Sequence, residues 1–256
     1  SQYLLTFYEL DSPTFVEKKM VDLQDKVFIS NPEAIEDFEK IGCSNVVFVP
    51  MGFDPDFKIT KSKSTVIEGK THFILMGKFE KRKHTKNIIK AWLKKYGNNN
   101  KYLLSCCVVN PFIKHEQMNA LLSELLEGNH YSNVNFLPHL KTNSEVNHLL
   151  NSADIDLSGA EGWNLPAFNA TALGKWSIVQ NHSAHKAWAN EKNCVLIEPG
   201  EKEPAADGLF FTSSGHFNQG NICGFDEEKA IEAMETAEEK FTYKKTVDII
   251  LENIKE

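Results

Sequence analysis

Short apolar runs alternate with helical patterns along almost the whole chain, and this alternation is the feature that most constrains the fold. Nine runs rich in β-branched and aromatic residues have the length of strands, at residues 3–8, 26–29, 46–49, 72–76, 102–109, 134–137, 155–157, 176–179 and 195–197. Helix patterns fill six of the intervals between them, at residues 13–23, 32–41, 85–96, 114–126, 144–151 and 165–173. Strands that alternate with helices form parallel sheets. We therefore predict an α/β fold with a doubly wound parallel sheet.

A polar segment at residues 58–70 interrupts this pattern. It is rich in Lys, Ser and Thr and lacks hydrophobic periodicity, which is typical of a linker or a loosely held loop. We therefore expect a reduced N-terminal α/β part at residues 1–57 and a Rossmann-like domain at residues 71–240. Residues 241–256 are expected to form a C-terminal helix, and packing of that helix against the N-terminal part is one arrangement to test.

Local signals place several element ends. Two helices are expected to close the chain, at residues 226–240 and 243–254, after a loop rich in Gly and Asn at residues 215–224. Two prolines are expected in the first turn of a helix, each directly after a capping residue: Pro13 after Ser12, and Pro32 after Asn31.

Composition narrows the class of protein. The 256 residues are 41% hydrophobic and 25% charged, as in ordinary globular proteins, and the net charge of -7 argues against nucleic acid as a partner. No apolar run reaches the length of a membrane span, and the first residues lack the pattern of a secretion signal. The five cysteines are an odd number without CxxC spacing, which favours a reducing, cytoplasmic location.

A basic loop follows the strand expected at residues 72–76. It reads Gly77-Lys78-Phe79-Glu80-Lys81-Arg82-Lys83-His84 and leads into a helix. A diphosphate needs Lys or Arg for charge and free backbone amides for hydrogen bonds, and a helix N-terminus supplies such amides. The alternative is a solvated basic turn, which is what most Lys and Arg clusters are.

A second unusual loop follows the strand expected at residues 155–157. It carries two glycines and a proline at residues 158–166, and it ends at the start of a helix. The carboxylate of Glu161 suits sugar hydroxyls, the amides after it suit a phosphate, and Asn169 lies one turn into the helix, where it suits a ribose. The alternative is a structural turn in which Glu161 caps the helix.

Other ligand motifs are absent or weak. The chain has no G-x-G-x-x-G and no G-x-x-x-x-G-K-[ST], so a dinucleotide or P-loop site has little support. Asp154 and Asp156 resemble a metal-binding Asp-x-Asp but fit a strand end better. His182 and His185 have near-metal spacing without a third ligand close by, so no metal is expected.

Three runs in sequence resemble the group-1 (family 4) glycosyltransferases. The first is the strand and Ser at residues 27–30 with VVFVPMGFD at 46–54, which resembles their domain junction. The second is residues 77–83 followed by IIKAW at 88–92, which resembles their donor-diphosphate segment. The third is EGWNLPAFNA at 161–170 followed by ALGK at 172–175, which resembles their E-x7-E signature. The order and spacing of all three match, and together they cover roughly residues 25–198.

The resemblance implies a GT-B fold whose C-terminal domain holds a nucleotide-diphospho-sugar without a metal. In the family's pattern, Arg82 and Lys83 bind the diphosphate, Glu161 contacts the donor sugar and Asn169 stands where a second Glu holds the ribose. The implied catalytic residues are Arg82, Lys83 and Glu161. The other implied donor-binding residues are Gly77, Lys78, Gly162, Trp163, Asn164, Leu165 and Asn169.

Three positions depart from the family pattern. Asn169 replaces a Glu, which weakens the ribose contact by about 1 kcal/mol because a neutral hydrogen bond replaces a charged one. Asn164 and His84 each replace a Gly, and Asn tolerates a left-handed backbone. Only about 55 residues precede the linker, so the acceptor half of the family's fold is absent or much reduced.

The expected function is transfer of a hexose-like sugar from a nucleotide-diphospho-sugar, such as a UDP- or GDP-sugar, to a hydroxyl acceptor. The implied reaction needs no metal and retains the anomeric configuration, and the acceptor is a glycan, lipid or protein. The alternatives are a non-catalytic nucleotide-sugar or carbohydrate-binding module and a half-enzyme completed by self-association or by a missing N-terminal domain. Peripheral contact with a membrane is a further expectation about partners.

Overall fold

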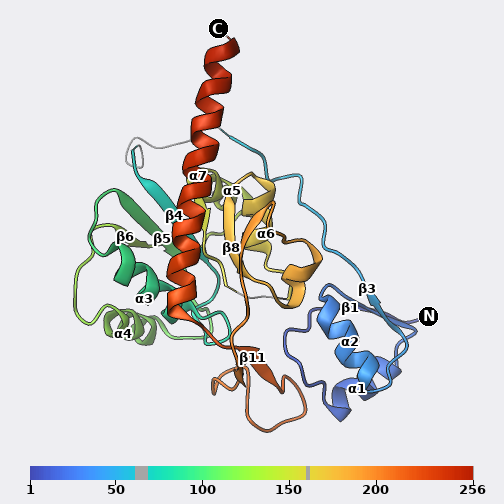
Figure 1. The fold of residues 1–256 in the computed structure, drawn as a ribbon. Helices are drawn as coiled ribbons and strands as arrows, with labels where there is room; N and C mark the ends of the chain where they lie inside the picture. Colours follow the sequence, from blue (N-terminus) through green and yellow to red (C-terminus); the bar gives the residue numbers. More distant parts are fainter. Residues whose placement is uncertain (61–68, 160–161, 256) are drawn as a thin grey trace.

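The computed structural model describes residues 1–60, 69–159 and 162–255 (Figure 1). Its larger sheet has six strands, all parallel to their neighbours, in the order β6-β5-β4-β7-β8-β9. The strands are β4 Thr71–Met76, β5 Tyr102–Cys107, β6 Val134–Phe136, β7 Ile155–Asp156, β8 Trp176–Gln180 and β9 Cys194–Ile197. The parallel α/β fold predicted from the sequence is confirmed.

The strand order fixes where a ligand can enter. The chain builds outward from β4 on one side through β5 and β6, then returns to place β7 on the other side. The direction of winding therefore reverses between β4 and β7, and ligands of open α/β sheets bind outside the carboxyl ends of the strands at such a reversal. The loops that follow these two strands are the two loops with unusual chemistry.

Helices cover both faces of this sheet. They are α3 Thr85–Tyr96, α4 His115–Leu125, α5 Asn143–Ser152, α6 Leu165–Ala172 and α7 Glu227–Lys255, with a short 3-10 helix at Ser183–Ala187. Successive residues of β4 alternate between the faces: Phe73 packs into the cluster under α3, α4 and α7, and Ile74 packs into the cluster under α5 and α6. Because both faces are buried, the strands are apolar at most positions.

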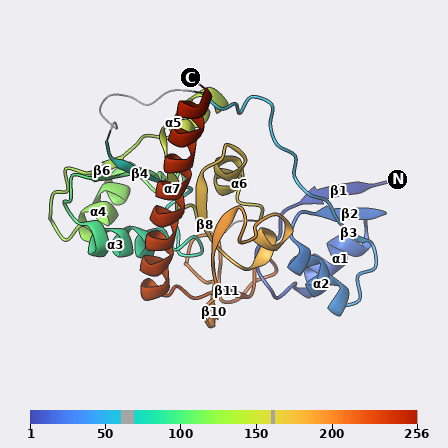
Figure 2. The ribbon, with the colours of Figure 1, turned by 45° about the horizontal axis from the view of Figure 1, so that its top comes forward.

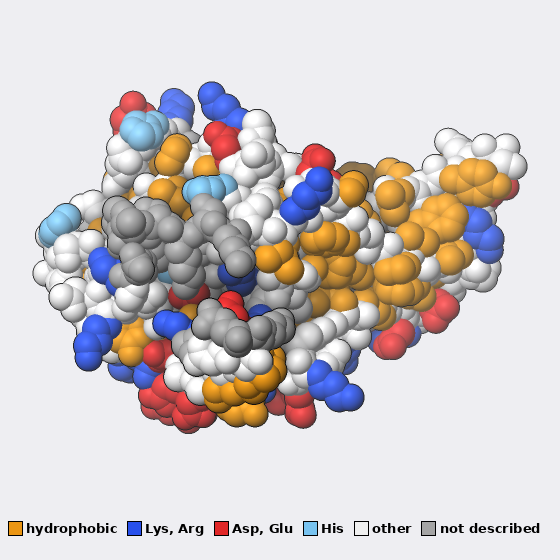
Figure 3. All heavy atoms as spheres, turned by 90° about the horizontal axis from the view of Figure 1, so that it is seen from above, with side chains coloured by type: hydrophobic (Ala, Val, Ile, Leu, Met, Phe, Trp, Pro, Cys, Tyr) orange, Lys and Arg blue, Asp and Glu red, His pale blue; other side chains and the backbone are white. Residues whose placement is uncertain are grey.

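The N-terminal part forms a second, smaller parallel sheet (Figure 2). Its strands are β1 Tyr3–Thr6, β2 Lys26–Ile29 and β3 Val46–Phe48, in the order β1-β2-β3, with helices α1 Phe15–Asp22 and α2 Pro32–Lys40. Val27 and Ile29 are fully buried, whereas Tyr3 and Leu5 on the edge strand are exposed. Figure 3 shows hydrophobic side chains spread over this arm of the molecule.

The chain ends in one long helix, not the two expected. Residues 240–243 contain neither Gly nor Pro, so nothing breaks α7 between its halves. The first half packs on α3, β8 and β9. Residues 241–255 continue past the sheet and lie away from β1–β3 in both ribbon views, so packing of this segment on the N-terminal part is not observed (Figures 1 and 2).

Of three other local predictions, one is confirmed and two differ from the structure. Helix α1 starts at Phe15, not at Pro13, because Thr14 and Glu17 form a capping box there. Pro32 and Asn31 do begin α2 as predicted. The segment 215–224, expected to be a loop, contains β11 Asn221–Cys223, which pairs antiparallel with β10 Lys202–Pro204.

Most of the expected linker, residues 61–68, lies outside the described residues. Before it, the backbone N–H groups of Lys58 and Thr60 donate to the side-chain oxygens of Asn147 and Asn151 on α5, so this end of the segment runs along the larger sheet. None of the helices in the described part of the chain combines the length and apolar content that crossing a bilayer requires.

Candidate functional site

Lys83 lies over the backbone of Gly77 at the carboxyl end of β4. Gly77 has φ 132°, which other residues rarely adopt, and a Cβ on it would lie 3.0 Å from the Lys83 Nζ, so a substitution would strain the backbone and shift this side chain. Lys83 is 4% exposed. Burial and the neighbouring charge of Arg82 lower the pKa of Lys83 to about 7, against the opposing effect of Glu80 and Glu9. An anion bound beside Lys83 would therefore favour the charged form of its side chain.

Arg82 is buried as well, and carboxylates from two parts of the chain hold it. Its Nη2 donates to Glu80 Oε1 at 2.6 Å, and its Nε lies 3.3 Å from Glu9 Oε2. The guanidinium also lies 5.7 Å from the centre of the Phe211 ring. Because Arg82 and Lys83 are both buried, the basic loop is not the solvated turn that was its alternative interpretation.

Lys78 has a different environment from the one the resemblance implies. Its Nζ lies over the rings of Phe112 and Phe210, 5.5 and 4.8 Å from their centres, and 3.7 Å from Glu80 Oε2. Its side chain is 36% exposed. Lys78 therefore stands at the rim of the basic loop, where it supports Glu80 and remains reachable from solvent.

The loop after β7 touches the basic loop directly. A Cβ on Gly159 would lie 2.2 Å from the Lys83 carbonyl oxygen, so a side chain at this position is sterically excluded. The structure thus brings together the two loops singled out in the sequence. Glu161 lies outside the described residues, so its predicted contact with a donor sugar stays a prediction.

Gly162 meets the N-terminal part of the chain. Its N–H donates to Glu9 Oε1 at 3.1 Å, and its carbonyl accepts from the Ser30 hydroxyl at 2.9 Å. A Cβ on Gly162 would lie 2.9 Å from Phe7 Cβ, which shows how tightly the segment after β1 is packed on this loop.

Asn164 shapes the start of α6. It adopts the left-handed conformation with φ 65° that the replacement of Gly by Asn allows, and its side-chain oxygen accepts from Ala167 N–H. Its Nδ2 donates to the Ser158 carbonyl at 3.1 Å and to His185 Nε2 at 2.8 Å. His185 receives this bond because its Nδ1–H donates to the Gln180 carbonyl at 2.8 Å. The amides at the N-terminus of α6 are thereby held in one orientation.

Trp163 and Leu165, the other two predicted residues of this loop, have opposite environments. Trp163 is 3% exposed, packs edge-on against Phe168 and accepts at its carbonyl from the Trp188 indole N–H. Leu165 is 45% exposed. Trp163 therefore fixes the loop from inside, whereas Leu165 faces solvent.

Asn169 is the other notable polar group of α6. It is 6% exposed, and its Oδ1 has no hydrogen-bond partner among the described residues. A buried acceptor without a partner is uncommon and points to a polar ligand or an ordered water. This observation fits the expectation that Asn169 meets a hydroxyl group, which stays a prediction.

His84 replaces another family glycine and keeps the glycine-like backbone. It has φ 52° at the N-cap of α3, and its Nε2 donates to the Cys223 carbonyl at 2.7 Å. A non-glycine residue held in this conformation is strained, and the bond to β11 together with burial compensates. His84 therefore ties the start of α3 to the β10–β11 hairpin.

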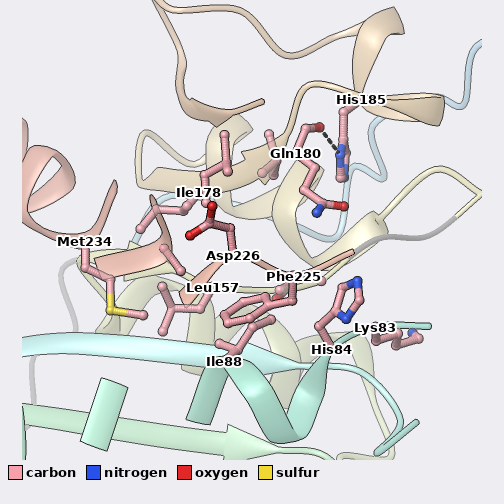
Figure 4. Close-up of a pocket in the computed structure, with 15 residues that line it drawn as sticks. Lys83, His84, Ile88, Leu157, Ile178, Gln180, His185, Phe225, Asp226 and Met234 are labelled. Atoms are coloured by element: carbon pink, nitrogen blue, oxygen red, sulfur yellow. Dashed lines mark hydrogen bonds between the residues drawn. The ribbon is translucent and has the colours of Figure 1, made fainter. Parts of the chain in front are cut away.

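A cavity of about 60 Å³ lies behind Lys83 and His84 (Figure 4). Its walls are mostly apolar, with Ile88, Leu157 and Phe225 among them. A space this small holds a few waters. Ser158 and Gly159 of the loop after β7 also line it, so the cavity lies between the two loops of the candidate site and reaches α7.

The acidic and histidine pairs weighed as metal ligands have structural roles. Asp154 accepts from His72 N–H at 2.9 Å, and Asp156 accepts from the Ser158 hydroxyl. His182 pairs with Glu33 at 2.7 Å. No cluster of three metal-ligating side chains occurs within residues 1–60, 69–159 and 162–255.

Two contacts in the site join residues that are far apart in the chain. Glu9 and Ser30 reach the Gly162 loop from 153 and 132 residues away along the chain. Ser30 lies in the first of the three runs that carry the resemblance, whereas Glu9 lies in no motif and had no sequence signal.

Comparison by sequence with protein-family models and with curated proteins gives no match. Comparison of folds gives clear ones. HepE from Anabaena, solved with UDP and glucose, matches with TM-score 0.63 and 14% identity over 78% of this chain and 58% of HepE. A glycosyltransferase from Rickettsia africae matches with TM-score 0.61 and 14% identity, over 77% and 56% of the two chains.

WaaG, a glycosyltransferase involved in lipopolysaccharide biosynthesis, matches with TM-score 0.58 and 17% identity, over 83% of this chain and 53% of WaaG. The chain thus spans between 53% and 58% of the length of these three structures. At these identities the matches establish the fold. Over the matched residues the chain has the GT-B fold of these structures.

Proposed function

We propose that the crevice between the loops after β4 and β7 binds a nucleotide-diphospho-sugar, and that the protein transfers a hexose-like sugar from it to a hydroxyl group. The observation that carries the proposal is the meeting of two buried cations, Arg82 and Lys83, with the loop that begins α6. Buried cations at the reversal point of a parallel sheet suit a doubly charged diphosphate.

The chemistry follows from the charge that develops on the leaving group. When the bond between sugar and diphosphate breaks, negative charge builds on the phosphate oxygen, and fixed donors in a water-poor site stabilise it. Arg82 and Lys83 supply positive charge, and the amides at the start of α6 supply a helix N-terminus. We propose that these groups suffice without a metal and that the reaction retains the anomeric configuration.

Recognition of the rest of the donor rests on α6. The partnerless Oδ1 of Asn169 suits a ribose hydroxyl as a hydrogen-bond donor. Glu161 remains the proposed contact to the sugar. HepE was solved with UDP and glucose, which makes UDP-sugars the first donors to test on this chain.

A second candidate function is binding without turnover, in a module or a half-enzyme that a partner domain completes. One observation favours it: Asn169 stands where the family pattern has an acidic residue. The exposed apolar side chains of β1 are where such a partner would pack.

Thermal-shift titration with UDP-, GDP- and dTDP-sugars tests the proposal. We expect one of them to raise the melting temperature, and we expect Arg82→Ala and Lys83→Ala to abolish that shift. Lys81→Ala is the matched control, because Lys81 lies in the same loop, is exposed, and donates from its ammonium group to the Pro204 carbonyl. Absence of any shift would exclude the donor site, and a shift without hydrolysis or transfer would favour the binding module.

A further inference from the structure

The carboxylate of Glu9 lies on two of the groups that a donor diphosphate would use. We propose that Glu9 is an internal competitor for the anionic part of the donor, which must displace this carboxylate to bind. The inference rests on the proposed function, because it concerns the same crevice. It adds a residue from the small sheet that lowers the affinity of the large one for its ligand.

The contacts of Glu9 are those of a bound anion. Oε1 accepts from Gly162 N–H at 3.1 Å, and Oε2 lies 3.3 Å from Arg82 Nε. A loop amide that precedes a helix and an Arg guanidinium are the donors that recur in phosphate sites. A carboxylate and a phosphate oxygen compete for both, since each carries negative charge and accepts hydrogen bonds.

Among the described residues, two carboxylates contact Arg82, and they differ in how they are held. Glu80 belongs to the same loop, has a side chain 3% exposed and bonds Arg82 Nη2 at 2.6 Å. Glu9 comes from the segment after β1, has a side chain 24% exposed and lies farther from the guanidinium. Glu80 therefore fixes Arg82 in the crevice, whereas Glu9 is the partner that a ligand can replace.

Displacement of Glu9 leaves the N-terminal part attached by other contacts. Glu33 pairs with His182 and Lys186, and Asp11 bonds Lys202 and Asn221 N–H. None of these contacts involves Arg82 or Gly162. The Glu9 contacts can therefore be lost while the two sheets stay docked. The affinity for the donor then depends on how much more strongly Arg82 and the Gly162 amide bind phosphate than they bind the Glu9 carboxylate.

Calorimetric titration with UDP and with inorganic pyrophosphate tests the competition. Glu9→Gln keeps the size of the side chain and removes its charge, and we expect it to raise the affinity for both probes about tenfold, as for loss of a charge-assisted hydrogen bond. Glu33→Gln is the matched control: it removes a carboxylate from the same interface but leaves Arg82 and Gly162 occupied, so we expect the affinity to stay as in the native chain.

Each outcome decides the matter. Equal affinity of the native chain and Glu9→Gln, or weaker binding by Glu9→Gln, would overturn the competition and leave the proposed function standing. An equal gain from Glu33→Gln would also overturn it, because looser docking would then be the cause. Failure of all three proteins to bind either probe would overturn the proposed function and this inference together. Glu9→Ala, which removes the competing side chain, must gain at least as much as Glu9→Gln.

Discussion

The two parallel sheets of this protein differ in how completely they are enclosed. Helices bury both faces of the six-stranded sheet, where Phe73, Ile74 and Leu104 are each 0% exposed. In the three-stranded sheet Ile29 is also 0% exposed, but Tyr3 on the edge strand is 63% exposed. The large sheet carries its own core, whereas the small one is covered on one side only.

The core of the small sheet is also shared. Its cluster includes Ala205, Phe211 and Ile222, which belong to the β10–β11 region of the larger part. This core is small and is completed by residues from the larger part. It is therefore marginally stable by itself, since stability rises with the area that a unit buries. The candidate site therefore joins a robust sheet, which supplies Arg82 and Lys83, to a weakly stabilised one, which supplies Glu9.

Phe73→Ala should have the largest effect. The ring is fully buried and contacts the rings of Trp92 and Tyr96. Its removal leaves a cavity in the core of the large sheet, and we expect the free energy of unfolding to fall by about 3–5 kcal/mol. Denaturant unfolding followed by circular dichroism measures it. An effect below about 1 kcal/mol would show that the large sheet does not set global stability.

Ile29→Ala makes the corresponding change in the small sheet. Ile29 is equally buried, so the local loss is about 2–5 kcal/mol. We expect it to appear as local opening: amide exchange in β1, β2 and β3 accelerates, while protection in β4 and β5 stays as in the native chain. Faster exchange throughout both sheets would mean that the two parts unfold as one unit, and the contrast between them would fail.

Most of the fold was predictable because each strand of the large sheet is short, apolar and followed by a helix pattern. The β10–β11 hairpin was missed because the three residues of β11, Asn-Ile-Cys, show no alternation long enough to read. The single helix α7 was missed because residues 240–243 are polar or aromatic without a true breaker. Local propensity does not determine whether a helix continues past such residues. In α7 the packed first half provides the helix that residues 241–255 extend.

The site was predictable only where its chemistry lies in one loop. Gly77, Arg82 and Lys83 stand together in the sequence, and the Gly159–Asn164 loop follows the neighbouring strand of the switch point. Glu9 was not predictable, because its contacts come from the docking of one sheet on another, over 153 residues of chain. Burial of the basic loop was also hidden: Lys and Arg are mostly exposed, and nothing local announces otherwise.

Gly162→Ala should separate the two sheets at their contact in the crevice. The new methyl group would lie 2.9 Å from Phe7 Cβ and 3.3 Å from Glu9 Cγ. We expect the overpacking to weaken docking of the small sheet by about 1–3 kcal/mol. Amide exchange in the segment after β1 should accelerate, with β5 unchanged. Gly52→Ala is the control, because a Cβ on Gly52 would meet nothing within 4 Å. Gly128→Ala is unsuitable, because Gly128 has φ 72° and the substitution would strain the backbone.

The affinity for UDP-glucose should depend on pH through Lys83. Burial and Arg82 hold the pKa of Lys83 at about 7, so the ammonium loses its proton as the pH rises through neutrality. The diphosphate of UDP-glucose keeps a constant charge in this range and binds the protonated form more tightly. The protonated fraction falls from about one half at pH 7 to about one tenth at pH 8, so we expect the affinity to fall by up to about fivefold over this interval.

Titration calorimetry at several pH values measures this dependence. Lys83→Met is the control: it should bind more weakly at neutral pH and show a flat profile. A native profile that is flat between about pH 6.5 and 8.5 would place the diphosphate away from Lys83, and the buried cations of the large sheet would then lack the role proposed for them.

The smallest expected effect concerns the ion pair that helps to hold the small sheet. Burial opposes the charge on His182, but its bonds to Cys223 and Glu33 outweigh burial and raise its pKa from 6.5 to about 9. Burial likewise opposes the charge on Glu33, but His182 and Lys186 lower its pKa from 4.5 to about 2. Both groups are thus charged in the docked state at neutral pH.

The sign of the pH dependence follows from these directions. The contribution of His182 is complete below pH 6.5 and is lost as the pH rises through about 9, whereas that of Glu33 is complete above pH 4.5 and is lost as the pH falls towards about 2. We expect protection of α2 against amide exchange, corrected for the intrinsic rate, to weaken by about 1 kcal/mol between pH 6 and pH 9.5. Glu33→Gln should remove most of this change. If α2 protection in the native chain does not vary, this half-buried ion pair contributes nothing, and the other contacts of the small sheet hold it in place.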